Sequence, residues 1–201
     1  MRSRPALSAS LFAHIVRVAF LGKSSRTALE VLDISGNNFN TTITPNWFWN
    51  STNLTSLNLR GCDFHGPIRL FQMTLAAWPL LNKFHSRGII SCPPWYSSSF
   101  KNLCNLKVLD LEQSSTPGDI TELMGRLSNC PSSKMQMLDL SYNHVSRALP
   151  NSSGPLTNLT YLVLCRNKLT GPIPQWIWQL SDLFILELAG NKLSGMSRNI
   201  I

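Results

Sequence analysis

The sequence has few charged residues and no long apolar run. Of its 201 residues, 10 are acidic and 18 are basic, and no stretch approaches 18 uninterrupted apolar residues. A membrane-spanning helix is therefore not expected within this chain. Signatures of kinases and of phosphate-binding loops are missing as well. The histidines show no mutual spacing of the kind that indicates a metal site, and they are His14, His65, His85 and His144. We expect no catalytic residues, no metal and no cofactor.

The positive charge is concentrated at the N-terminus. Residues 1–28 contain five basic residues and no acidic one, whereas the rest of the chain carries a net charge of only +3. A nucleic-acid-binding surface would need a basic stripe with stacking aromatic residues, which is absent, so we expect no nucleic-acid partner. Residues 1–28 are interpreted as a non-repeat basic leader. Its apolar stretch, residues 8–22, is interrupted by His14 and Arg17, which argues against a working signal peptide.

One phrase recurs along the chain, and its clearest copy runs from Leu159 to Pro174. Its fixed positions read L-x-x-L-x-L-x-x-N-x-L-x-G-x-I-P. The same frame fits five other places, which begin at Leu29, Leu54, Leu106, Met135 and Leu183. Successive starts differ by 25, 52, 29, 24 and 24 residues. Because 52 is about two periods, we expect one further coil between Leu70 and Leu103, although no clean phrase is visible there.

Each fixed position has a structural role in a solenoid. The L-x-x-L-x-L segment alternates, so Leu162 and Leu164 are expected to point inward and Tyr161 outward. The asparagine is expected to hydrogen-bond backbone groups that the bend would otherwise bury unpaired. Cys62 and Ser114 occupy this position in two copies. The pattern predicts an α/β solenoid, a horseshoe with a parallel β-sheet on its concave face and short helical or irregular convex segments, over residues 29–201, with a degenerate coil at about 70–103.

The phrase, its Gly-x-Ile-Pro tail and the 24-residue spacing resemble the plant-specific class of leucine-rich repeats. The stretch from Asn102 to Leu111, followed by 118–123 and 127–130, resembles plant receptor-like proteins of the fungal-elicitor-receptor type. This resemblance covers roughly residues 29–201 and implies an extracellular ligand-binding domain at the plasma-membrane surface of a longer parent, of which this chain would be a fragment.

The resemblance implies perception of a peptide or protein ligand in defence or peptide signalling, with a co-receptor kinase as a partner of the full-length parent. An alternative is a soluble inhibitor of cell-wall enzymes, located in the apoplast, similar to the polygalacturonase-inhibiting proteins. These share the repeat class and need no membrane anchor.

Outward strand positions form the candidate binding surface on the concave face. We select the large polar or aromatic side chains among them, because such groups contribute most to binding: Arg60, Glu112, Tyr161 and Glu187. A second recurring motif, Pro-x-Trp-x-Trp, appears at Pro45–Trp49 and Pro174–Trp178. We expect its tryptophans to pack on the convex side.

Sequons and cysteines suggest the secretory pathway. Five Asn-x-Ser/Thr sequons predict glycosylation at Asn40, Asn50, Asn53, Asn151 and Asn158. Cys104 and Cys130 are 26 residues apart, about one coil, so a disulfide between them is possible. Cys92 and Cys165 remain candidate free thiols.

Overall fold

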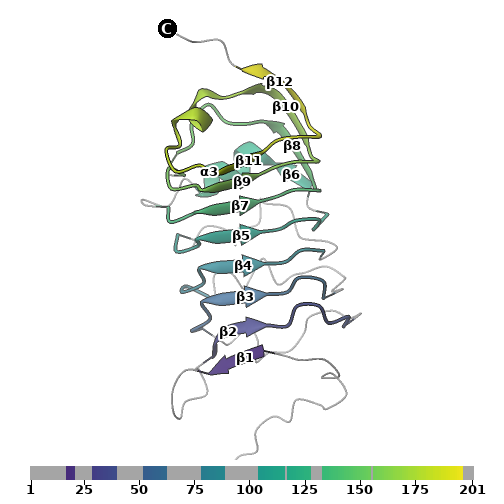
Figure 1. Ribbon diagram of the computed structural model, residues 1–201, viewed down its shortest axis with the longest axis vertical. Coiled ribbons are helices and arrows are strands. Elements are labelled where there is room, and N and C mark those ends of the chain that lie inside the picture. The colour runs from purple at the N-terminus through teal and green to yellow at the C-terminus, as the bar shows by residue number, and fades with distance from the viewer. Residues whose placement is uncertain are drawn as a thin grey trace, which may run out of the picture.

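A parallel sheet with one strand from each coil forms the spine of the molecule. The computed structural model describes residues 17–20, 29–39, 52–62, 78–88, 104–115, 117–127, 133–154 and 156–196. Within them an eight-stranded sheet has the order β1 (Arg17–Phe20), β2 (Leu29–Asp33), β3 (Ser56–Asn58), β4 (Lys83–His85), β5 (Val108–Asp110), β7 (Met137–Asp139), β9 (Tyr161–Val163) and β11 (Ile185–Glu187). Figure 1 shows these strands stacked as successive rungs. All are parallel except β1, which pairs antiparallel with β2.

The middle residue of each strand points into the core. Leu57, Phe84, Leu109, Leu138 and Leu162 stand opposite one another across neighbouring strands, and each is at most 2% exposed. Their neighbours on either side point outward, as the alternation of a strand requires. The predicted horseshoe class, with its parallel sheet and leucine-lined interior, is confirmed.

Strand β4 lies in the interval where no clean phrase is visible. It pairs with β3 on one side and β5 on the other, so the sheet is continuous there. Its coil begins at Leu81, and Phe84 and Ser86 occupy the second and third leucine positions. These two replacements hide the repeat from pattern matching. Gly88 adopts a positive φ of 76° at the turn after the strand, a conformation that glycine enters without steric cost.

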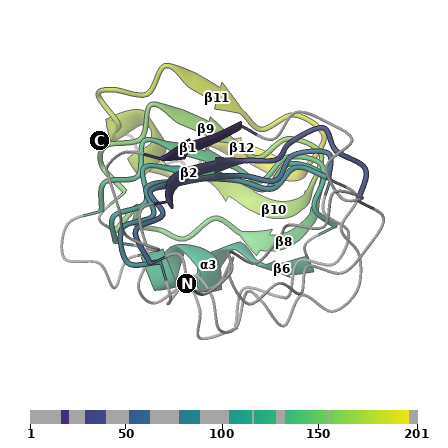
Figure 2. The same ribbon diagram turned by 90° about the horizontal axis from the view of Figure 1, so that it is seen from below.

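A second parallel sheet was not expected from the sequence. It contains β6 (Pro117–Asp119), β8 (His144–Ala148), β10 (Lys168–Ile173) and β12 (Lys192–Met196). The Gly-x-Ile segment of the tail lies inside strand β10. Figure 2 shows α3 (Ile120–Leu127) on the side opposite to the eight-stranded sheet. No helix in the described ranges is long and apolar enough to cross a membrane.

The tryptophan motif after β10 folds as a short 3-10 helix, η4 (Gln175–Gln179). Trp176 is 5% exposed, and its Nε1 donates a hydrogen bond to the Pro150 carbonyl at 2.7 Å. Trp178 is 57% exposed. The packing role predicted for this motif therefore holds for Trp176 and is wrong for Trp178, while the first copy of the motif, residues 45–49, lies outside the described residues.

The asparagine position forms a ladder between coils. Asn167 Nδ2 donates to the Leu140 carbonyl of the preceding coil at 2.8 Å and to the Leu164 carbonyl of its own coil at 3.1 Å. Its Oδ1 accepts the N–H of Val145 at 3.0 Å. Asn143 and Asn191 make equivalent bonds. The predicted inward role of this asparagine is confirmed, because each one satisfies backbone groups of two coils at once.

Candidate ligand-binding face

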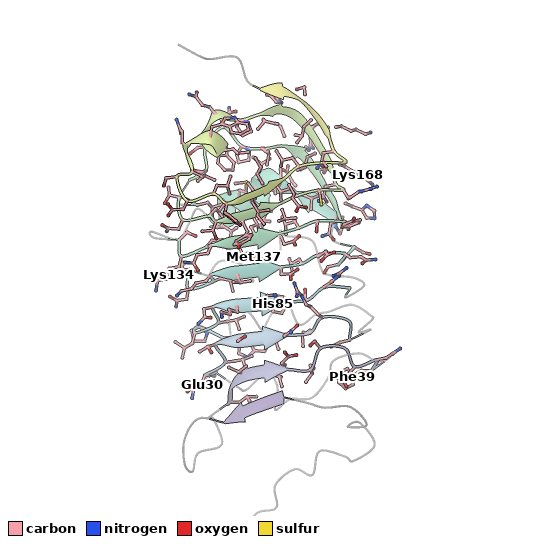
Figure 3. All side chains as sticks on the ribbon, viewed as in Figure 1. Glu30, Phe39, His85, Lys134, Met137 and Lys168 are labelled. Carbon is pink, nitrogen blue, oxygen red and sulfur yellow. The ribbon has the colours of Figure 1, made fainter. Side chains whose placement is uncertain are left out.

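The outward residues of the eight-stranded sheet form three columns along the solenoid. In β4, for example, Lys83 and His85 lie on the strand and Arg87 follows it, all on the outward side. The matching positions on β5 are Val108, Asp110 and Glu112, because the register pairs Lys83 with Val108 and His85 with Asp110. Figure 3 labels His85 and Met137 on two strands of this face.

Asp110 is the centre of an ion-pair network in the N-terminal part of this face. Its carboxylate accepts hydrogen bonds from the Arg60 guanidinium, from His85 Nδ1 at 3.1 Å and from the Glu112 N–H at 3.1 Å. The Asp110 side chain is fully buried, whereas that of Arg60 is 41% exposed. Burial acts to raise the pKa of Asp110, but the bonds from His85, the Glu112 N–H and Arg60 together outweigh it and hold that pKa below its ordinary value.

Glu112 and Asp139 extend this network toward the next coil. Glu112 pairs with Arg87 at 3.1 Å, and Asp139 accepts both the N–H and the hydroxyl of Ser141, at 2.9 and 2.7 Å. Burial, reinforced by the neighbouring carboxylates, raises the pKa of both Glu112 and Asp139. Carboxylate oxygens of Asp110, Glu112 and Asp139 lie within 4.8 Å of one another. Arg60 and Arg87 supply the positive charge next to Asp110 and Glu112, and His85 adds a hydrogen bond to Asp110.

A carboxylate or amide side chain closes the end of four of these strands. An oxygen of this side chain accepts the backbone N–H two residues later, a local bond typical of aspartate and asparagine. This occurs at Asp33, Asn58, Asp110 and Asp139, with distances of 2.9 to 3.2 Å. Asp33, Asp110 and Asp139 are therefore outward strand residues that also shape the turn that follows.

The C-terminal part of the face is more apolar. The rings of Tyr161 and Phe184 meet edge-to-face with centroids 6.1 Å apart, and Phe184 is 79% exposed. Glu187 is exposed and accepts a weak hydrogen bond from the Cys165 thiol, at 3.7 Å. At the edge of the sheet the Arg166 guanidinium lies 5.9 Å from the Tyr142 ring centroid, within the range of a cation–π contact.

The four residues selected from the sequence fall into two groups. Arg60 and Glu112 belong to the ion-pair network, whereas Tyr161 and Glu187 lie on β9 and β11. Their role in ligand binding stays a prediction. Three residues of this face escaped sequence reasoning because the phrase of their coil was not recognised: Lys83, His85 and Arg87. Counting one period back from Leu106 leads to Leu81 and would have found them.

The predicted glycosylation sites are placed only in part. Asn151 and Asn158 are exposed and Asn53 is half-buried, while Asn40 and Asn50 lie outside the described residues. The sequon threonines Thr55 and Thr160 donate to carbonyls of the preceding coil at 3.0 and 2.9 Å. They therefore have a structural role whether or not a glycan is attached, and glycosylation stays a prediction.

The described cysteines include one in a disulfide bond and two free thiols. Cys104 is disulfide-bonded. Its proposed partner Cys130 lies outside the described residues, as does the candidate free thiol Cys92, so the Cys104–Cys130 pairing stays a prediction. Cys62 and Cys165 are free and buried. The Cys62 thiol donates to the Ile34 carbonyl at 3.1 Å, and burial is the main reason that its pKa is raised to about 12.

A sequence profile described as leucine rich repeat matches residues 7–64 and 133–193 of this chain. These ranges contain more than half of its residues. The chain belongs to the leucine-rich repeat family. No curated protein sequence matches it.

Solved structures with the same fold are ectodomains and complexes of plant receptors. The plant peptide hormone receptor RGFR1, in complex with RGF2, is 30% identical with a TM-score of 0.70, over 83% of this chain and 25% of that one. The ectodomain of the Arabidopsis thaliana membrane receptor kinase GASSHO1/SCHENGEN3, in complex with CASPARIAN STRIP INTEGRITY FACTOR 2, is 30% identical with a TM-score of 0.69. The match covers 85% of this chain and 21% of that one. The Arabidopsis receptor kinase HAESA, in complex with the peptide hormone IDA and the co-receptor SERK1, is 25% identical with a TM-score of 0.67. The match covers 81% of this chain and 26% of that one.

This leucine-rich repeat chain thus spans about a quarter of the length of each of these receptor chains. The resemblance to plant receptors that the repeat class and spacing indicate is confirmed by these structures.

Proposed function

We propose that this chain is a ligand-binding segment of a plant receptor ectodomain, and that its concave face binds a peptide or protein in defence or peptide perception. The observation that carries the proposal is the continuous outward surface of strands β2 to β11, which presents charged and aromatic side chains in three aligned columns. Such large polar and aromatic groups provide most of the binding energy in protein interfaces.

The similar receptors support the same proposal. RGFR1 and HAESA are described in complex with peptide hormones or related peptides, and HAESA also with a co-receptor. By analogy, the parent of this chain acts at the extracellular face of the plasma membrane, binds its ligand without chemical conversion, and recruits a co-receptor kinase. Fold-level analogy is weaker support than site geometry, so the test addresses the concave face directly.

The test uses the full chain and peptides of random sequence displayed on phage. Peptides that bind are then examined by hydrogen exchange on the complex. We expect them to slow exchange in strands β3 to β11 and in the turns that follow those strands. Protection confined to the second sheet or to η4, or a failure to select any binding peptide, would refute the proposal.

A matched pair of substitutions sharpens this test. Lys83→Glu reverses an exposed charge on the concave face, whereas Lys168→Glu reverses an exposed charge on strand β10 of the second sheet. We expect Lys83→Glu to change the affinity for selected peptides and Lys168→Glu to leave it unchanged, because only the first charge lies beside the proposed ligand.

A further inference from the structure

The two halves of the concave face differ in how their carboxylates are neutralised. Asp110 and Glu112 have cationic partners, Arg60 for the first and Arg87 for the second, and His85 Nδ1 also hydrogen-bonds Asp110. Asp139 and Glu187 have no cationic partner within 4.0 Å among the described residues, although Asp139 is only 9% exposed. A carboxylate that is nearly buried without a countercharge is costly, and a bound cation would remove that cost.

An apolar column lies beside these two carboxylates. Val108, Met137, Tyr161 and Ile185 stand at the same register position of four consecutive strands, and all are half-buried. The exposed Phe184 widens the column through its edge-to-face contact with Tyr161. Four parallel strands span about 14 Å at the usual spacing, which is the length of about four extended residues.

The carboxylates and the column form a single surface. Asp139, Val163 and Glu187 stand opposite one another on β7, β9 and β11, so the two carboxylates flank Val163 and their strands are about 10 Å apart. Tyr161 precedes Val163 by two residues and therefore faces the same way. We name this surface the acidic–apolar face: the column Val108, Met137, Tyr161, Phe184 and Ile185, together with Asp139, Val163 and Glu187.

We propose that the acidic–apolar face binds an extended peptide whose apolar side chains contact the column and whose lysine or arginine side chain lies between Asp139 and Glu187. This inference rests on the proposed function and specifies its ligand chemistry. Charge complementarity selects the occupant: carboxylates without a cationic partner repel acidic peptides and polyanions, while the aliphatic stem of a lysine or arginine packs on Val163 and Tyr161.

The probes are three synthetic peptides, capped at both ends, in which leucine alternates with lysine, glutamine or glutamate. Fluorescence anisotropy with the full chain measures their affinities. We expect the lysine peptide to bind at least tenfold more tightly than the glutamine peptide, and the glutamate peptide to bind least. Raising the salt concentration should weaken the lysine peptide most, because exposed charge pairs are screened.

Substitutions assign the binding to this face. Glu187→Gln and Phe184→Ala should each weaken the lysine peptide at least threefold, and Glu187→Gln should leave the glutamine peptide unaffected. Asp182→Asn removes an exposed charge from the same coil outside this face, and Trp178→Ala removes an exposed aromatic ring from η4. Both controls should bind like the unmodified chain.

Three results would overturn the inference. The first is equal affinity for the lysine and glutamate peptides, and the second is an equal loss of affinity for the lysine peptide in Glu187→Gln and Asp182→Asn. The third is a set of phage-selected peptides that protect the concave face but carry no basic residue. The last result would leave the proposed function standing. Failure to find any peptide that protects the concave face would overturn the proposed function as well.

Discussion

The N-terminal coils, residues 29–88, and the C-terminal coils, residues 133–196, contribute to one sheet but differ in what joins each coil to the next. In the C-terminal coils the interior asparagines Asn143, Asn167 and Asn191 bridge successive coils with donors and an acceptor. In the N-terminal coils Cys62 occupies the equivalent position with a single weak donor, and its main-chain carbonyl accepts the N–H of Phe39 at 3.1 Å.

A second connection joins the N-terminal coils to the coil of β5, whereas no ion pair joins successive coils among the described residues of 133–196. Arg60 on one coil reaches Asp110 two coils away, across His85. This connection runs over the concave face and occupies charged groups there. Coils that are joined through their interior leave the concave face free for a ligand, whereas coils joined over the concave face use part of that surface for stability.

The largest expected effect is a loss of core packing in a C-terminal coil. Leu162 is completely buried, so Leu162→Ala should lower the free energy of unfolding by about 2 to 5 kcal/mol, through lost burial and a cavity. Leu186 is only half-buried on the last described strand of the sheet, so Leu186→Ala should cost less, contrary to the similar values that the repeat pattern alone suggests. Denaturant titration measures both.

Hydrogen exchange on Leu162→Ala tests how far the damage spreads. Each coil contacts mainly its neighbours, so loss of protection should be concentrated around β7, β9 and β11. Equal loss of protection in β3 and β4 would show that the two sets of coils unfold as one unit.

Breaking the ion-pair network should destabilise the N-terminal coils. Asp110→Asn leaves Arg60 without its countercharge and weakens the hydrogen bond to His85, and we expect a loss of about 1 to 3 kcal/mol of unfolding free energy at neutral pH. Because the pKa of Asp110 is lowered in the folded state, its contribution is present above the ordinary pKa of aspartate and is lost as the pH falls through the lowered value. Thermal unfolding should therefore be measured from neutral to acidic pH. The difference in melting temperature between Asp110→Asn and the unmodified chain should become smaller at low pH.

Asp139→Asn provides the opposite case. The pKa of Asp139 is raised, mainly by burial, so its ionised form costs stability above that raised pKa, and the cost disappears as the pH falls through it. The asparagine keeps an oxygen that can accept from Ser141. Asp139→Asn should therefore be stabilising at neutral pH, with a gain that vanishes in acid; destabilisation at neutral pH would contradict the assignment.

The interior ladder predicts a difference between two substitutions at one repeat position. Asn167→Ala leaves buried backbone groups of two coils unpaired and should cost about 1 to 3 kcal/mol. Cys62→Ala removes only a weak thiol donor to Ile34, whose carbonyl also accepts from Asn37 at 2.8 Å, and it should cost less. Denaturant titrations of the two variants measure this difference in unfolding free energy. Equal losses of unfolding free energy would show that the asparagine ladder does not distinguish the two sets of coils.

The sequence predicts the interior of this molecule better than its surface. Leucines, the asparagine position and the parallel sheet follow from the repeat, because burial imposes the same residue types on every coil. Part of the charged half of the concave face did not follow: Arg60 and Glu112 were selected from the sequence, but Phe84 and Ser86 mask the coil that carries His85 and Arg87. The second sheet was missed since Gly171 and Pro172 are typical of bends, yet they lie in a strand here.

The smallest expected effect concerns one backbone position in the second sheet. Gly171 has a φ of 77°, and Arg147, at the same repeat position one coil earlier, has a φ of 76°. A side chain in this left-handed region costs about 1 kcal/mol, whereas glycine increases the entropy of the unfolded chain. Arg147 is exposed, and its guanidinium lies 3.7 Å from Asp119, a surface contact that is worth little. Arg147→Gly should therefore raise the unfolding free energy by a few tenths of a kcal/mol, up to about 1.

Ser146→Gly is the matched control, because the φ of Ser146 is not positive, and it should lower the unfolding free energy. If Arg147→Gly lowers the unfolding free energy by the same amount as Ser146→Gly, the left-handed backbone at residue 147 carries no strain.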